Sequence, residues 1–356
     1  MSKKTLYFLF LTVIVAAFFS YQKFFNSDAL FGKDKAEKDG GVVNIYSSRK
    51  EELIKDILRA FTQKTGIKVN HVFDDPTKLI SRIKSEGKKT HADLFITADV
   101  LNLILAAKID ILSPVDSDIL KQTIPANLRS DRWFGLTKRV RLIVYSKDRV
   151  NVSDLDDYEG LADPKWKDRV LIRSSSNPYN QSLIASIIAA DGEDKAREWI
   201  RGLVRNMARP PYGGDTDQIR AVAAGEGDVT IVNSYYVARI LTSENKSDRK
   251  IAERVGVFFP NQDNRGSMVN ISGAGIIKDA KNRKNAIRLL EFMTSPEAQE
   301  MYAKNNHEYP ILASAPLSAQ LLEWEKSGVK LDQSPLENLV PHMDLAVKIA
   351  DEEGWR

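Results

Sequence analysis

From residue 42 onward, short runs of apolar and β-branched residues alternate with segments whose apolar residues have the spacing of a helix. Residues 42–46 form a run typical of a strand, and apolar residues at helical spacing follow within residues 53–61. Gly66 then stands where that helix should end, because glycine adopts the left-handed conformation of a C-terminal cap at little cost. The alternation predicts an α/β protein with a mostly parallel sheet and helices on both of its faces.

The same alternation continues toward the C-terminal third of the chain. Further strands are expected at residues 67–72, 94–96, 142–145, 170–172, 229–232 and 255–259. Helices are expected near residues 100–107, 183–190, 196–207 and 219–224. Ser295 followed by Pro296 is typical of a helix start, since serine caps the free amides and proline suits the first turn.

Composition excludes several classes of protein. A chain of 356 residues points to two domains, and its 43% hydrophobic and 28% charged residues exclude polytopic membrane proteins and disordered chains. The chain has no cysteine, which excludes disulfides, thiolate metal sites and cysteine nucleophiles. Only four histidines make a His-rich zinc or copper site improbable. Fifty-two basic and 48 acidic residues nearly balance, so no partner nucleic acid is expected.

The N-terminus has the pattern of an export signal. Lys3 and Lys4 precede an apolar run over residues 6–19 that is too short to span a bilayer comfortably. We therefore expect residues 1–25 to be a signal peptide or an uncleaved N-terminal anchor, and residues 26–41 to be a polar linker. Either alternative puts the body of the protein outside the cytoplasm.

An exported, two-domain α/β protein of this size is typical of solute-binding proteins, whose two lobes close on a ligand at the carboxyl ends of the strands. The serines of the chain have no histidine in an obvious triad arrangement, and no metal-hydrolase motif occurs. We therefore expect a binding protein and no enzyme.

Three tyrosines stand at predicted switches from strand to helix. Tyr235 and Tyr236 follow the strand at residues 229–232, and Tyr179 follows a strand that ends near Arg173. These switches lie at the edge of the sheet where α/β proteins place ligands. For Tyr235 and Tyr236 taken alone, a half-buried aromatic pair at a lobe surface is the favoured explanation, and Tyr179 shifts the balance toward a ligand site.

Three phenols in one cleft favour a hard trivalent cation. A free phenol ionises near pH 10, so phenolates at neutral pH need strong charge compensation, which a bound metal ion supplies. Fe³⁺ is small and oxygen-seeking, and three phenolates neutralise its charge. The pattern thus predicts Fe³⁺ bound by Tyr179, Tyr235 and Tyr236.

An anion site is predicted beside the tyrosines. Ser175, Ser176 and Asn177 precede a helix, whose amides and dipole favour a negative charge, although N-capping alone also explains such residues. Arg139 is expected to hold a small anion bidentately, whereas Arg141 is expected to be a solvated strand end.

At these segments the chain resembles the periplasmic ferric-ion-binding proteins of bacterial iron(III) ABC transporters. The matching stretches span nearly all of residues 42–310 and are WFGLTKRVRLIVY, RSSSNPYNQSLIAS, NMARPPYGGDTDQIRAVAAGEGDVTIVNSYYVARI, NQDNRGSMVNISGAG and EFMTSPEAQEMYA. The resemblance implies a class II two-lobe periplasmic binding protein, with a mixed sheet flanked by helices in each lobe, two crossover strands and a ligand cleft between the lobes.

The resemblance also implies a function. It implies that the three tyrosines bind Fe³⁺. It also implies an anion beside the iron, either carbonate held by Arg139 or phosphate held by residues 175–177. The bound iron would be delivered to an inner-membrane permease and its ATPase. We expect a periplasmic monomer. Its first lobe is expected to comprise residues 42–137 and 263–311, and its second lobe residues 138–262 and 312–356.

The chain departs from this family just after the motif YSSR. Some members carry a His-Tyr pair there that contributes iron ligands, whereas this chain has Lys50 and Glu51. Glu51 or Asp99 is a candidate for a first-lobe carboxylate, although solvated surface is favoured for both. Whether the lobes close on iron is left open.

The sequence is also compatible with two alternative functions. The same fold could bind an organic phosphate or another small anion, or the chain could be a membrane-tethered sensor module.

Overall fold

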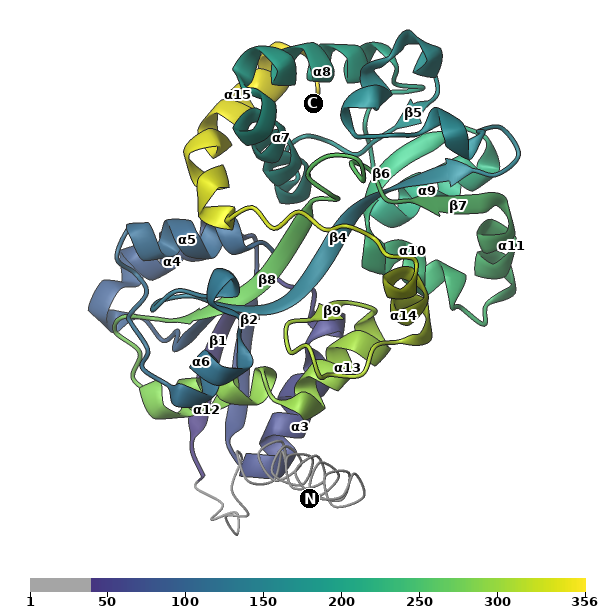
Figure 1. Cartoon of the computed structure of the whole chain (residues 1–356). Helices are drawn as coiled ribbons and strands as arrows, with labels where there is room; N and C mark the ends of the chain where they lie inside the picture. Colours follow the sequence, from purple (N-terminus) through teal and green to yellow (C-terminus); the bar gives the residue numbers. More distant parts are fainter. Residues whose placement is uncertain (1–39) are drawn as a thin grey trace, which may run out of the picture.

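The computed structural model describes residues 40–356. The predicted signal peptide or anchor at residues 1–25, and the predicted linker up to residue 39, lie outside the described residues. Figure 1 shows two bodies that are joined by two long strands, β4 (Phe134–Ser146) and β8 (Val269–Ile276). We call the lower body the first lobe and the upper body the second lobe.

The first lobe is built on three strands at one end of the sheet. β1 (Val42–Ser47) pairs in parallel with β2 (Lys68–Phe73) and with β3 (Leu94–Thr97), and β3 pairs with β8. The helices of this lobe are α3 (Lys55–Thr65), α4 (Pro76–Glu86), α5 (Val100–Lys108), α6 (Asp118–Thr123), α12 (Arg283–Met293) and α13 (Pro296–Asn306). Its core lies between the sheet and α3 and α12, whose Phe61 and Phe292 rings are 5.6 Å apart.

The second lobe is built around the other half of β4. β4 pairs with β6 (Val229–Asn233) and β7 (Val255–Phe258), and β6 pairs with β5 (Val170–Leu171). The helices are α7 (Pro178–Asp191), α8 (Glu193–Arg205), α9 (Asp215–Ala224), α10 (Ser234–Leu241), α11 (Lys246–Arg254) and α15 (Met343–Glu352). Helices on the outside of both halves of the sheet bury its apolar residues.

The prediction of a mostly parallel sheet is wrong. Among the named strands of residues 40–356, only β1 with β2, β1 with β3, and β5 with β6 pair in parallel. β4 and β8 cross between the lobes in opposite directions, so they pair antiparallel with each other and with their neighbours, including β9 (Tyr309–Pro310). The mixed sheet and the two crossover strands that the resemblance implies are therefore confirmed.

The predicted helix ends agree with the structure. α3 ends at Gly66, which has φ 74° and the left-handed conformation of a C-terminal cap. The side chain of Ser295 accepts a hydrogen bond from the Ala298 amide, and Pro296 occupies the first turn of α13. The strand predicted at residues 142–145 is only the last part of β4, because Thr137, Lys138 and Arg139 interrupt its apolar pattern.

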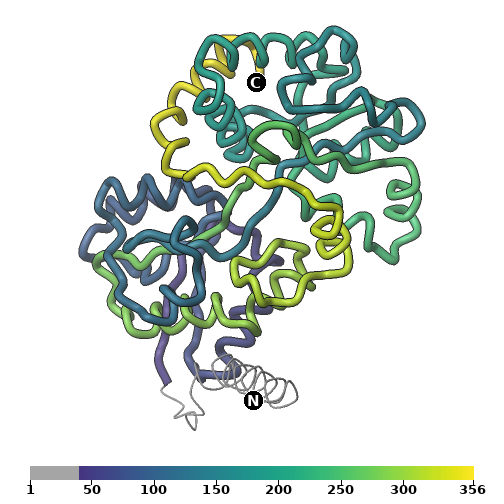
Figure 2. The backbone as a smooth tube through the Cα atoms, viewed as in Figure 1, coloured from purple at the N-terminus to yellow at the C-terminus, as the bar shows by residue number. Residues whose placement is uncertain are grey.

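The C-terminal segment runs along both lobes. After α14 (Ala319–Lys326), which packs against α10, the chain crosses the molecule as the yellow tube in Figure 2. The 3-10 helix Leu336–His342 then packs against α5 of the first lobe and α7 of the second. In the part of the chain that the structure describes, no helix combines the length and the apolar character that a membrane crossing needs.

Candidate functional site

Tyr235 and Tyr236 lie in the first turn of α10, immediately after β6 ends at Asn233. Their side chains are nearly inaccessible, since Tyr235 is 1% and Tyr236 is 8% exposed. The two ring centroids are 4.0 Å apart, so the adjacent phenols lie side by side at the switch from strand to helix. Leu53 of the first lobe belongs to the same buried apolar cluster, so both lobes take part in covering the pair.

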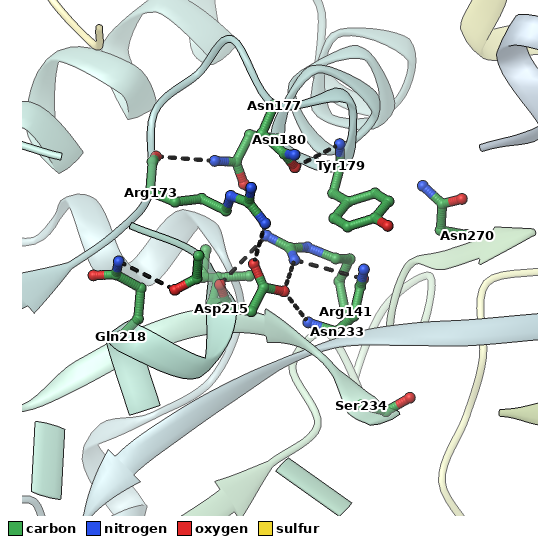
Figure 3. Close-up of polar contacts among 12 residues, drawn as sticks. Arg141, Arg173, Asn177, Tyr179, Asn180, Asp215, Gln218, Asn233, Ser234 and Asn270 are labelled. Carbon is green, nitrogen blue, oxygen red and sulfur yellow. Dashed lines mark hydrogen bonds and ion pairs between the residues drawn. The ribbon is translucent and has the colours of Figure 1, made fainter. Parts of the chain in front are cut away.

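Tyr179 lies in the first turn of α7 and is half-buried. Its ring extends from the start of α7 on the side of Asn270, a residue of β8 (Figure 3). The guanidinium carbons of Arg139 and Arg173 lie 5.6 and 5.9 Å from the centre of the ring. The three tyrosines thus come from the starts of two helices of the second lobe, both at the ends of β-strands.

Tyr179 lies close enough to Tyr235 and Tyr236 to influence the ionisation of both. Burial raises the pKa of Tyr235 well above its usual value, and negative charge on Tyr179 or Tyr236 raises it further. Burial and the charge of Tyr179 likewise raise the pKa of Tyr236. Arg139 opposes the rise for Tyr235, and Arg173 opposes it for Tyr236. Both phenols therefore keep their protons at neutral pH unless a cation compensates the phenolates.

Arg139, the predicted anion ligand, is 1% exposed and already has protein partners. Its Nη2 donates hydrogen bonds to the Ala98 carbonyl and, at 3.1 Å, to Asn270 Oδ1. Its Nη1 lies 3.7 Å from Glu308 Oε1, and its Nε has no hydrogen-bond partner. The side chain is thus held in place beside Tyr179 by the two hydrogen bonds of Nη2.

Arg49 and Glu308 form a buried ion pair that the sequence did not predict. Arg49 Nη2 donates to Glu308 Oε2 at 2.6 Å, and both side chains have no exposed surface. Burial lowers the pKa of Arg49, but the Glu308 carboxylate more than reverses the effect and the net shift is upward. Because Arg139 approaches the other oxygen of Glu308, two arginines share one carboxylate here.

Arg141 is not the solvated strand end that was predicted. It is fully buried, and its Nη1 lies 3.2 Å from Asp215 Oδ2 while its Nη2 donates to Asn180 Oδ1 at 2.8 Å. Arg173 binds the other oxygen of Asp215 at 2.9 Å (Figure 3). The physical reason is that β4 lies inside the sheet, where helices cover both of its faces. A charged residue there needs a buried partner, and Asp215 at the start of α9 provides it.

The serine-rich loop makes contacts within the protein. Asn177 Oδ1 accepts the Tyr179 amide at 3.0 Å, which is the N-cap of α7. Ser175 Oγ donates to the Trp355 carbonyl at 2.5 Å, whereas Ser176 is exposed and its Oγ lies 2.8 Å from Ser174 Oγ. Capping therefore accounts for Asn177, and the anion-binding role of the three residues stays a prediction.

The first-lobe residues considered as iron ligands differ in their exposure and position. Glu51 is exposed, as expected, and lies 3.9 Å from His71. Lys50 Nζ lies 5.8 Å from the centre of the Tyr236 ring, so a positive charge occupies the position from which other members are expected to offer ligands. Asp99 was expected on the solvated surface, and this is wrong: it is 3% exposed because it caps α5 at the boundary between the lobes. Burial raises its pKa.

Other metal ligands are scarce. Among residues 40–356, no group of three or more His, Cys, Asp or Glu side chains is arranged to hold a metal ion.

Comparisons with known proteins agree with this architecture. Residues 56–328 match the family model described as bacterial extracellular solute-binding protein. Iron uptake protein A1 of a Synechocystis strain is 48% identical over 316 residues, which are 88% of this chain and 87% of the relative. A Trichodesmium protein solved in complex with iron and citrate is 47% identical with a TM-score of 0.81, covering 89% of this chain and all of that one.

A third relative is the ferric binding protein from Campylobacter jejuni, which is 42% identical with a TM-score of 0.84 and covers 88% of this chain and all of that one. The matches extend through both lobes and include nearly the full length of each relative. The chain therefore belongs to the bacterial extracellular solute-binding proteins, in the group that contains the periplasmic ferric-ion-binding proteins of iron ABC transporters.

Proposed function

We propose that the protein binds Fe³⁺ outside the cytoplasm through the phenolates of Tyr179, Tyr235 and Tyr236 and delivers it to an ABC importer. The observation that carries the proposal is the placement of three tyrosines at the starts of α7 and α10, where the charge of Tyr179 raises the pKa of both Tyr235 and Tyr236. Phenols that burial and mutual repulsion keep protonated gain most from a small, hard trivalent cation, because its charge offsets both effects. Relatives named for iron uptake or ferric binding support the same substrate.

The second lobe supplies the proposed ligands, and the first lobe supplies cover. Lys50 cannot act as an anionic ligand, Glu51 is exposed, and the oxygens of Asp99 already accept hydrogen bonds from the protein. We propose that a synergistic anion, carbonate or phosphate, completes the coordination. Arg139 would hold it together with the loop of Ser175, Ser176 and Asn177.

The proposed partners are an inner-membrane permease and its ATPase, and the proposed state is a periplasmic monomer that does no catalysis. We keep residues 42–137 with 263–311 as the proposed first lobe, and residues 138–262 with 312–356 as the proposed second lobe. Within the latter, α14 and α15 pack against α10 and α7.

The absorption spectrum of the purified protein tests the proposal. Adding ferric citrate should produce a visible band from charge transfer between phenolate and iron. A colourless protein whose melting temperature rises with a sugar phosphate would instead support the organic-anion alternative. Retention of residues 1–25 in the mature protein, together with the absence of any ligand, would support a tethered sensor.

Acidification should release the iron. The raised pKa values of Tyr235 and Tyr236 mean that both phenols carry protons in the iron-free protein at neutral pH, so binding must displace a proton from each. The apparent affinity should then fall about tenfold per pH unit for each displaced proton as the pH decreases. Competition titrations between pH 8 and about 5.5 measure this slope; a slope of zero would contradict binding by these phenolates.

A further inference from the structure

The buried carboxylate of Asp99 connects three parts of the molecule. Its Oδ2 accepts hydrogen bonds from Ser182 Oγ at 2.6 Å and from Asn270 Nδ2 at 2.7 Å. Asp99 belongs to the first lobe, Ser182 lies in α7 of the second lobe, and Asn270 lies in the crossover strand β8. A single oxygen atom thus bridges the two lobes and the connection between them.

Two short paths lead from this oxygen to the tyrosines. Ser182 lies within one helical turn of Tyr179 on α7. On the other side, Asn270 Oδ1 accepts a hydrogen bond from Arg139, the residue opposite it in the pairing of β4 with β8. The Arg139 guanidinium carbon lies 5.6 Å from the centre of the Tyr179 ring, and Figure 3 shows Asn270 on the side toward which the Tyr179 ring extends.

We propose that Asp99 is a positioning residue of the iron site: when the lobes close, it fixes Tyr179 through Ser182 and Arg139 through Asn270 without itself binding iron. The inference rests on the proposed function and assigns Asp99 a role different from that of a first-lobe iron ligand. It also explains how the first lobe contributes to the site although Lys50 stands at the expected ligand position.

A purely local role does not account for the contacts of Asp99. Capping of α5 uses only Oδ1, which accepts the Leu101 amide at 2.8 Å. Oδ2 faces the other lobe instead. The gap that Asp99, Ser182 and Asn270 border leaves no room for a water molecule, so solvent does not replace these hydrogen bonds while the lobes touch. Separation of the lobes breaks the contact with Ser182, and the bond therefore favours the closed form.

Ser182→Ala tests the bridge, and Ser186→Ala is its matched control. Both serines are buried in α7 and lie near a carbonyl of their own helix, Ser182 Oγ 2.8 Å from the Pro178 oxygen and Ser186 Oγ 2.7 Å from the Leu183 oxygen. The single hydroxyl proton of Ser182 is shared between Pro178 and the Asp99 carboxylate. Of the two serines, only Ser182 forms a hydrogen bond to the first lobe within residues 40–356. Ser182→Ala should weaken iron binding about tenfold, the expected effect of losing a hydrogen bond to a charged group, while Ser186→Ala should leave affinity unchanged.

The distance between the lobes gives a readout that a general loss of stability would not change. Because the chain has no cysteine, Lys84→Cys on α4 and Lys195→Cys on α8 create two unique, exposed sites for spin labels. Ser182→Ala should shift the distance distribution with ferric citrate toward the open form, and Ser186→Ala should not. Equal distributions in both variants would overturn the proposal.

Asp99→Ser separates capping from bridging. Serine still caps α5, but it is too short to reach Ser182, so this variant should reproduce the shift of Ser182→Ala. The double variant should be no more open than Asp99→Ser alone, since Asp99→Ser already removes the bond to Ser182; additive shifts would overturn the proposal. If the parent protein does not bind iron at all, the proposed function fails, whereas the iron-free distance distributions still test the bridge.

Discussion

Tyr235→Phe and Tyr236→Phe should each weaken ferric iron binding by two or more orders of magnitude and remove most of the visible band. Each substitution deletes one phenolate from the proposed set while the ring continues to pack against its neighbour 4.0 Å away. Tyr179→Phe should have nearly the same effect. Competition with citrate at constant pH measures the affinities for ferric iron. The intensity of the visible band reports how many phenolates still bind the iron.

Tyr302→Phe is the matched control for these three variants. Tyr302 is also fully buried, but it lies in α13 of the first lobe and its hydroxyl has no hydrogen-bond partner. Its removal should leave both the band and the affinity unchanged. Full affinity in all three site variants, or an equal loss in Tyr302→Phe, would contradict the assignment of the ligands.

Asp215→Ala should cost about 3–5 kcal/mol of unfolding free energy, because it leaves the buried charge of Arg141 and the partly buried charge of Arg173 without their shared carboxylate. The Asp215 side chain also accepts the Asn233 amide at 2.8 Å, so the end of β6, just before Tyr235, loses a contact as well. Urea denaturation followed by circular dichroism measures the change.

Glu297→Ala provides the comparison for Asp215→Ala. Glu297 pairs with Lys64 at 2.8 Å on the exposed surface, where an ion pair contributes less than about 1 kcal/mol. If the two variants lose the same small amount of stability, the buried network around Asp215 does not support the second lobe as inferred.

The elements were predictable where a single local pattern determines them. The strand run and helix at residues 42–65, the cap at Gly66 and the start of α13 agree with the sequence because each depends on neighbouring residues. The direction of strand pairing depends on segments far apart in the chain, such as residues 94–97 with 273–276. The alternation of strands and helices in the sequence does not indicate whether two strands pair parallel or antiparallel.

In the site, too, features that depend on neighbouring residues were predictable, and features that depend on distant residues were not. The three tyrosines could be selected because each stands at a switch from strand to helix, which is visible in the sequence. The partners of Arg141 and Arg49 could not, since Asp215 and Glu308 lie 74 and 259 residues away along the chain. Burial of Asp99 was missed for a similar reason: nothing near it in the sequence indicates that the other lobe covers it.

The order of pairing along β4 and β8 has a consequence for folding. The first lobe is discontinuous in the chain, because β3 finds its neighbour β8 only after most of the second lobe, up to β7, has been inserted between them. Contacts over such separations close slowly, so this lobe should mature last. A fragment that ends before β8 should not contain a first lobe that folds by itself. Heating the whole protein should unfold both lobes in one cooperative transition.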